Sequence, residues 1–194
     1  QNPKWIVGYS DITVLHNHIH NFGIETLHAT MPLDIAKNTE QAIETLRKSL
    51  FGKPLVYEIS ANEENKIGTA TGELVGGNLS ILYSLLGSES TIDTKGKILF
   101  IEDLDEYLYH IDRMFMNLKR NGYFTNLQGL IVGGMNDMHD NAIPLGKTAK
   151  EILLDGVSEF DFPVILDFPA GHLKDNCALI LGRNVKLEVS LTTF

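Results

Sequence analysis

The chain has 194 residues, of which 43% are hydrophobic and 21% are charged, as in an ordinary globular protein. Its formal net charge of −9 disfavours sequence-independent nucleic-acid binding, because such binding needs cationic side chains that neutralise phosphates. The single cysteine, Cys177, excludes an internal disulfide, and no apolar stretch reaches the roughly 18 residues of a membrane-spanning helix.

Strand and helix patterns alternate from the start of the chain. Apolar residues cluster in short runs or recur at helical spacing, and Gly23 and Gly52 end the two helical patterns. The elements expected, in chain order, are a strand over residues 4–8, a helix over 12–22, a strand over 24–29, and a helix capped by Asn38 or Thr39 that ends at Gly52. This alternation predicts an α/β fold.

After Pro54 the pattern changes, and we place a domain boundary at about residues 52–60. The elements expected beyond it are strands over 55–60 and 68–74, a helix over 79–86, a strand over 97–101, a helix over 106–121, a strand over 127–132, a helix over 148–158, a strand over 163–168 and a hairpin over 179–191. The Thr- and Gly-rich strand at 68–74 is of the antiparallel type. We expect two domains, 1–55 and 56–194.

Three short phrases carry the chemistry: Gly8-Tyr9-Ser10-Asp11, Phe100-Ile101-Glu102-Asp103 and Pro169-Ala170-Gly171-His172. A serine at a strand-to-helix turn, a carboxylate that ends a buried strand and a loop histidine follow one another in the chain. Acyl-transfer hydrolases need these groups as nucleophile, orienter and base, because a serine hydroxyl reacts only when a positioned imidazole takes its proton. Only folding brings such distant residues together.

Each phrase alone also has an ordinary structural explanation. Ser10 is a typical helix N-cap. Glu102 suits the first turn of the next helix, as do Asp103 and its acidic neighbours. His172 fits a surface loop. The spacing of these residues does not decide between the alternatives.

A metal site is a further alternative. His16 and His20 share a helix face, and His18 lies between them, but no third ligand stands at a typical spacing, so exposed helix histidines are the favoured explanation. Asp137, His139 and Asp140 also form a group of potential metal ligands in a polar loop, and a metal site is equally disfavoured there. We expect Cys177, in an apolar run, to be a buried and inert thiol. Gly76-Gly77-Asn78 is typical of a helix start, where backbone N–H groups can face an anion.

Taken together, the phrases resemble the LD-carboxypeptidases, serine peptidases that include the microcin C immunity peptidases. The matching phrases span nearly the whole chain, in family order. They are Asn2-Pro3-Lys4, the run Gly8 to Thr13, the run Gly72 to Leu79, the run Lys97 to Asp103, Ile111-Asp112-Arg113-Met114 and Pro169-Ala170-Gly171-His172.

The resemblance implies a role for each candidate residue. Ser10 is the expected nucleophile, His172 its general base and Glu102 the orienter of the imidazole. The backbone N–H of Asp11 is expected at the oxyanion, and Asn78 in the substrate pocket. No metal or cofactor is implied.

The resemblance also implies a fold and a substrate. Residues 1–55 would be part of a parallel, Rossmann-like N-terminal domain that bears the serine. Residues 56–194 would form a mixed β/α, swivelling and barrel-like C-terminal domain. Members hydrolyse the bond between an L-centre diamino acid and D-alanine in murein tetrapeptides during cytoplasmic peptidoglycan recycling, commonly as homodimers, with neither nucleic acid nor a membrane as partner.

One departure from the family pattern affects activity. Only nine residues precede Ser10, whereas relatives carry most of a domain there, with a loop thought to supply an oxyanion amide. The chain therefore resembles an N-terminally truncated member, and we expect these residues alone to be weakly active or inactive, because losing one such donor costs about 10²–10³ in rate.

Three other functions are considered. A microcin C-type immunity peptidase would need an aromatic side chain that clamps the nucleotide base of its substrate. The single tryptophan, Trp5, lies in the strand before Ser10, so this alternative is less favoured. A non-catalytic binding protein would keep the fold without the chemistry. A metal-dependent enzyme would use His16 and His20.

Overall fold

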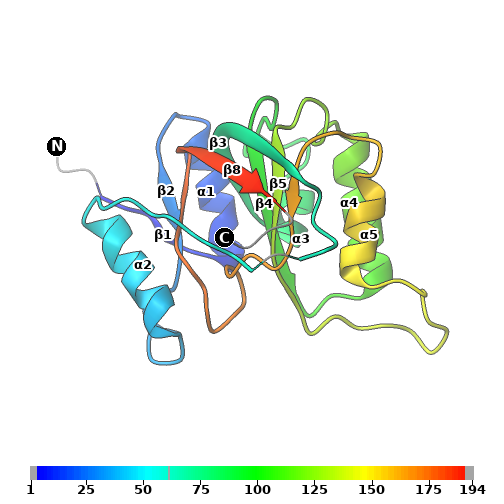
Figure 1. Cartoon of the computed structure of the whole chain (residues 1–194), viewed down its shortest axis with the longest axis horizontal. Coiled ribbons are helices and arrows are strands. Elements are labelled where there is room, and N and C mark those ends of the chain that lie inside the picture. Colours follow the sequence, from blue (N-terminus) through cyan, green and yellow to red (C-terminus); the bar gives the residue numbers. More distant parts are fainter. Residues whose placement is uncertain (1–3, 61, 191–194) are drawn as a thin grey trace.

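The computed structural model describes residues 4–60 and 62–190, which form two β-sheets covered by helices (Figure 1). The smaller sheet has the strand order β1 (Val7–Gly8), β2 (Thr26–His28), β7 (Leu179–Leu181). The larger has the order β6 (Val164–Ile165), β5 (Gly129–Asn136), β4 (Ile98–Leu104), β3 (Gly68–Asn78), β8 (Asn184–Val189). The helices are η1 (Ser10–Ile12), α1 (Thr13–His20), α2 (Glu40–Leu50), α3 (Leu79–Ser84), α4 (Leu108–Arg120) and α5 (Ala149–Gly156).

Parallel pairing dominates both sheets. Strands β3, β4, β5 and β6 are parallel neighbours, and β8 is antiparallel to β3. In the small sheet β1 is parallel to β2, and β7 is antiparallel to β2. The predicted α/β class is therefore confirmed. Since β7 pairs with β2, the small sheet combines strands from both sides of the boundary expected near 52–60, and the division into domains stays a prediction.

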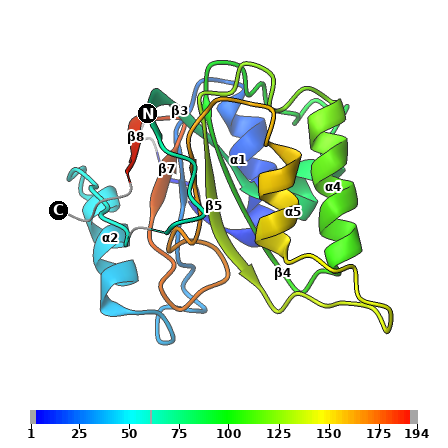
Figure 2. The same ribbon diagram turned by 45° about the vertical axis from the view of Figure 1, so that its right-hand side comes forward.

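The larger sheet is buried on both faces, as the continuous apolar run in β4 requires. Because side chains alternate along a strand, Leu99 and Ile101 face one core, and Ile98 and Phe100 face the other. The first core is closed by the apolar stripe of α4, namely Ile111, Met114, Phe115 and Leu118. Figure 2 shows α4 and α5 together on that side, with α2 on the opposite side of the molecule.

Two predicted elements are wrong. Residues 179–191 do not form a hairpin, because the link between β7 and β8 passes from the small sheet to the large one. Leu74 of β3 holds that link by donating its N–H to the Arg183 carbonyl and accepting the N–H of Gly182. Residues 55–60 form no strand: they are alternately half-buried and exposed, as predicted for a strand, but they pair with neither sheet.

Strands β3 and β5 continue through glycine pairs that were expected to end them. Gly76 and Gly77 lie within β3, and Gly133 and Gly134 lie within β5. Gly76 has a φ of +128°, and a Cβ atom built there would lie 1.9 Å from the Phe100 carbonyl oxygen. The glycine therefore permits close approach of β3 to β4 rather than a turn. Asn78, the last residue of β3, then caps α3.

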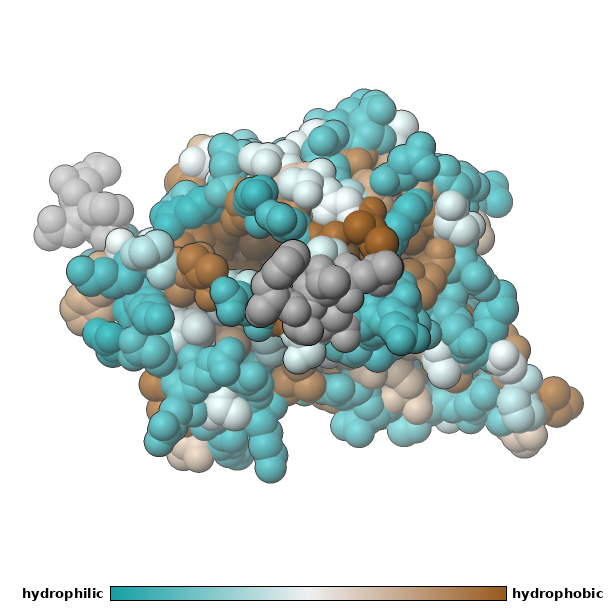
Figure 3. Space-filling model, in the orientation of Figure 1, coloured by the Kyte–Doolittle hydropathy of each residue, from teal (hydrophilic) through white to brown (hydrophobic). Residues whose placement is uncertain are grey.

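The surface in the orientation of Figure 1 is largely hydrophilic, with apolar residues gathered in a few places toward the middle of this face (Figure 3). Within the parts of the chain that the structure describes, every helix is too short or too polar to cross a bilayer.

We expect Gly76→Ala to lower the free energy of unfolding by about 3 kcal/mol or more, because β3 must move away from the backbone of β4. Gly87 is a matched control: its φ is also positive, +77°, but a Cβ atom there meets nothing within 4 Å. Gly87→Ala should cost only about 1 kcal/mol of backbone strain. Urea unfolding followed by circular dichroism measures both, and equal losses would contradict the close-approach explanation.

Candidate active site

The Ser10 turn joins β1 to α1 with a strained backbone. Tyr9 is extended, Ser10 has a φ of +59°, and η1 then leads into α1. The left-handed conformation is costly for a residue with a side chain, by about 1–3 kcal/mol, and such positions concentrate at functional sites. Tyr9, not Ser10, occupies the N-cap position, and no side chain caps this end. The N-cap alternative for Ser10 is therefore wrong.

Glu102 lies inside β4 rather than in the first turn of α4, and its side chain is 0% exposed. Its Oε2 atom is 2.7 Å from Nδ1 of His172 and also accepts the backbone N–H of His172 at 3.2 Å. Burial of a carboxylate is unfavourable unless hydrogen-bond donors replace water; His172 supplies two donors to Oε2, whereas the buried Oε1 has no partner among the described residues. The acid and the histidine singled out in the sequence are thus in direct contact.

The loop that carries His172 is held at three successive residues by asparagine side chains. Asn176 accepts the N–H of Gly171 at 2.9 Å, Asn136 donates to the carbonyl of His172 at 2.6 Å, and Asn38 donates to the next carbonyl at 3.2 Å. Sequence analysis missed these asparagines, because nothing local links them to the histidine. Gly171 has a φ of +107°, and a Cβ atom there would lie 2.6 Å from Glu102 Oε2.

The Ser10 turn reaches the histidine through Tyr9. The rings of Tyr9 and His172 are edge to face, with centroids 4.9 Å apart. The Tyr9 hydroxyl donates to Asp34 Oδ2 at 2.9 Å. Within residues 4–60 and 62–190 no hydrogen bond joins the Ser10 hydroxyl to His172. The third link of the expected triad is therefore a proposal, supported by the packing of its neighbour.

Charges around His172 favour its protonated form. Burial lowers the pKa of the imidazole, but the hydrogen bond and charge of Glu102, with the charges of Asp103 and Asp34, outweigh burial and raise that pKa above its ordinary value. Protonated His172 therefore stabilises the fold below the ordinary pKa, and this contribution is lost as the pH rises through the folded-state value. Burial, together with Asp34, raises the pKa of Tyr9 to about 12, so its hydroxyl stays a donor.

Asn78 and Asp11, the remaining expected site residues, have different surroundings. Asn78 is buried, donates to Asp103 Oδ1 at 3.0 Å, and accepts the N–H of Ile81 as the cap of α3. Burial raises the pKa of Asp103 to about 6. The Asn78 side chain is thus engaged in structural hydrogen bonds, and its place in a substrate pocket stays a prediction. Asp11 is exposed and follows Ser10 in η1.

Two family models match this chain. Residues 71–187 match the LD-carboxypeptidase C-terminal domain, and residues 1–29 match the LD-carboxypeptidase N-terminal domain. The first match alone spans more than half of the chain. The chain belongs to the LD-carboxypeptidase family.

Individual relatives agree with this family assignment. The chain is 37% identical to a probable murein peptide carboxypeptidase of Bacillus subtilis, over 100% of this chain and 62% of that protein. It is 30% identical to the microcin C7 self-immunity protein MccF of Escherichia coli, over 97% of this chain and 63% of that protein. The chain thus spans less than two thirds of the length of these relatives.

A solved structure also resembles this one. The muramoyltetrapeptide carboxypeptidase from Oxalobacter formigenes matches with a TM-score of 0.88 at 25% identity, over 97% of this chain and 65% of that one. The match confirms the expected α/β fold, with its parallel N-terminal part and mixed C-terminal sheet.

The histidines of α1 are structural in this LD-carboxypeptidase chain. His16 is 1% exposed, and its ring nitrogens contact the Gly8 carbonyl and the Thr26 hydroxyl, each at 2.9 Å. Because the carbonyl only accepts, Nε2 carries the proton, and burial lowers the pKa of this neutral ring. His20 is also buried, so the expectation of exposed histidines is wrong. The described part of the chain contains no cluster of three potential metal ligands.

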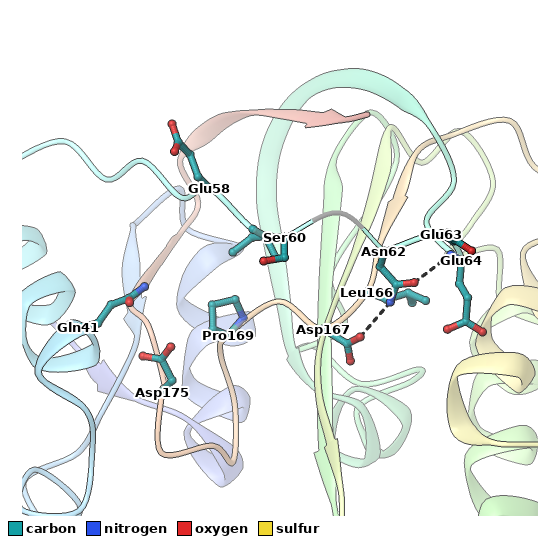
Figure 4. Close-up of a pocket in the computed structure, with 11 residues that line it drawn as sticks. Gln41, Glu58, Ser60, Asn62, Glu63, Glu64, Leu166, Asp167, Pro169 and Asp175 are labelled. Carbon is teal, nitrogen blue, oxygen red and sulfur yellow. Dashed lines mark hydrogen bonds between the residues drawn. The ribbon is translucent and has the colours of Figure 1, made fainter. Parts of the chain in front are cut away.

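A hollow of about 720 Å³ lies beside the histidine loop without including the candidate residues (Figure 4). Pro169 and Asp175 from that loop line it, and Glu58, Glu63 and Asp167 contribute to its acidic wall. Neither Glu102 nor His172 borders it in the described residues. Cys177 is buried as expected, and burial raises the pKa of its thiol to about 12, which makes it a poor nucleophile.

Replacing Glu102 by glutamine should lower the pKa of His172 relative to the parent protein, because burial is then opposed only by the charges of Asp103 and Asp34. Titration of the histidine ring protons by NMR measures the change. Glu106→Gln is the matched control, since Glu106 contacts His110 at 2.6 Å instead. A His172 pKa that stays raised in Glu102→Gln would rule out Glu102 as its main electrostatic partner.

Proposed function

We propose that this chain carries the catalytic residues of a serine-type LD-carboxypeptidase, with Ser10 as nucleophile, His172 as general base and Glu102 as orienter. The observation that carries the proposal is the 2.7 Å contact between fully buried Glu102 and His172 Nδ1, beside the strained turn of Ser10. A buried carboxylate at Nδ1 leaves Nε2 for proton transfer. In serine hydrolases the carboxylate likewise orients the imidazole, and Nε2 exchanges the proton with the serine.

The acylation step follows from these roles. Nε2 of His172 takes the hydroxyl proton of Ser10 as Oγ forms a bond to the scissile carbonyl carbon, and the carbonyl electron pair moves onto oxygen. Glu102 stabilises the imidazolium that forms, because its carboxylate is shielded from water and already hydrogen-bonded to Nδ1. The raised pKa of His172 favours this charged state.

The oxyanion would face the backbone N–H of Asp11, at the start of η1. Collapse of the tetrahedral intermediate breaks the carbon–nitrogen bond, and the imidazolium of His172 protonates the departing amine. Water, deprotonated by the same imidazole, then attacks the ester carbonyl on Ser10; the bond between that carbon and Oγ breaks, the shortened peptide leaves with a new carboxylate, and the imidazolium returns its proton to Oγ.

Murein tetrapeptides are the proposed substrates, cleaved between the L-centre diamino acid and D-alanine. The names of the relatives support this choice: a probable murein peptide carboxypeptidase in Bacillus subtilis and a murein tetrapeptide carboxypeptidase in Pseudomonas aeruginosa, 22% identical to this chain. Action in cytoplasmic peptidoglycan recycling and assembly as a homodimer belong to the same proposal.

In catalytically competent protein, Ser10→Ala should lower kcat by about 10⁴–10⁶, because the covalent step is lost. Release of D-alanine from a tetrapeptide measures the rate, and a fluorophosphonate probe should label the parent protein but not the variant. Ser84→Ala is the control, since Ser84 is exposed and bonds only the Ile81 carbonyl of its own helix. A loss below tenfold would remove Ser10 from its role.

A second candidate is a microcin C-type immunity peptidase, favoured by the 30% identity to MccF. It uses the same residues on a peptidyl-nucleotide, so substrate preference decides between them. We expect kcat/KM for the murein tetrapeptide to exceed that for a peptidyl-sulfamoyl nucleoside by at least about tenfold, measured on one protein preparation; the reverse order would assign the immunity function. Cleavage of neither substrate, with no fluorophosphonate labelling, would favour the non-catalytic binding protein.

A further inference from the structure

A row of exposed aromatic side chains follows the strand that carries Glu102. We define the aromatic ledge as Asp105, Tyr107, Tyr109 and His139. Tyr107 is 43% exposed and Tyr109 is 39% exposed. The ring centroids of Tyr107 and Tyr109 are 5.5 Å apart, as are those of Tyr107 and His139. The rings therefore form one continuous surface.

The ledge is rigid. The N–H of His139 donates to the Glu106 carbonyl, and the N–H of Leu108 donates to the His139 carbonyl, both at 2.9 Å. The side chains of Asp105 and His139 are 2.5 Å apart, and Asp105 is held at a φ of +61°. Backbone and side chains thus join the loop after β4 to the loop after β5. A preformed surface loses little conformational entropy when a ligand binds.

Asn136 connects the ledge to the candidate active site. Its carbonyl accepts the N–H of Asp105 at 3.0 Å, and its side chain donates to the carbonyl of His172 at 2.6 Å. The ledge and His172 lie at the carboxyl ends of the parallel strands β4, β5 and β6, which is the edge where α/β proteins bind ligands.

The far end of the ledge opens into a hollow of about 590 Å³ on α4. The guanidinium carbon of Arg113 lies 5.4 Å from the centre of the Tyr109 ring. The hollow is lined by Tyr109, Asp112, Arg113, Met116, Asn117 and Arg120. Arg113 lines the hollow and forms no ion pair within the described residues. Aromatic faces with a few fixed polar groups are typical of small-molecule sites.

We propose that the aromatic ledge binds the sugar ring of a muramoyl-peptide substrate. The inference rests on the proposed function and identifies a part of the substrate that the catalytic residues do not contact. A pyranose ring presents C–H groups on its faces and hydroxyls at its rim. The tyrosine rings match the faces, and the Asp105 carboxylate, His139 and Arg113 match the hydroxyls.

The length of the peptide limits how far the sugar lies from the scissile bond. An extended tetrapeptide spans at most about 13–14 Å, and the sugar is attached at the end opposite the terminal D-alanine. With the scissile bond at Ser10 and His172, the sugar lies past the histidine loop, where Asn136 leads to the ledge. A muramoyltetrapeptide, named for the Oxalobacter formigenes relative, carries such a sugar.

The test uses catalytically competent protein and compares two substrates, a free tetrapeptide and the same tetrapeptide bearing N-acetylmuramic acid. Tyr107→Ala combined with Tyr109→Ala should lower kcat/KM for the muramoyl substrate about tenfold, mainly through KM, and change the free tetrapeptide less than twofold. Phe51→Ala is the control, because Phe51 is 71% exposed and outside the ledge. Equal effects on both substrates, or no effect on either, would overturn the proposal.

A binding measurement separates this proposal from the proposed function. NMR titration with N-acetylmuramic acid should shift the ring signals of Tyr107, Tyr109 and His139 in the Ser10→Ala variant. Binding by the variant, together with cleavage of neither substrate by catalytically competent parent protein, would refute the peptidase and keep the sugar site. Failure to bind N-acetylmuramic acid would overturn the sugar site. Dissociation of a dimer by the two tyrosine substitutions would also overturn it, because the ledge would then be a subunit interface.

Discussion

The hydrogen bond between Glu102 and His172 is the interaction on which the site depends. A carboxylate with no exposure to water is costly unless donors satisfy it, and His172 provides both its ring and its backbone N–H. This requirement explains Gly171, whose missing Cβ lets the loop approach Glu102. It also explains why three asparagines fix that loop, since a small shift would leave the carboxylate unpaired.

The strained serine turn needs support of the same kind. His16 bonds the Gly8 carbonyl and Thr26, and so holds β1 and β2 at the point where the chain turns into η1. His28 lies beneath Tyr9 as a fully buried ring whose nitrogens have no partner among the described residues, and burial lowers its pKa to about 3. These neutral imidazoles fill space behind the turn without adding charge next to His172.

The Glu102–His172 pair and the aromatic ledge meet at one edge of the larger sheet. Asn136, at the end of β5, touches the histidine loop on one side and the aromatic ledge on the other. Parallel strands bring their carboxyl ends to a common edge, so residues far apart in the chain become neighbours there. Asn136 thus holds the His172 loop with its side chain and the loop after β4 with its backbone carbonyl.

The sequence by itself determined the elements whose signals are local. The apolar stripe of α4 and the Thr39 cap of α2 follow from the residues within one or two helical turns, and the order of Ser10, Glu102 and His172 indicated a hydrolase. Tertiary structure decided what depends on distant partners: β7 joins β2 and not β8, and His16 is buried. Pairing and burial depend on which surfaces meet, and these surfaces come from segments far apart in the chain.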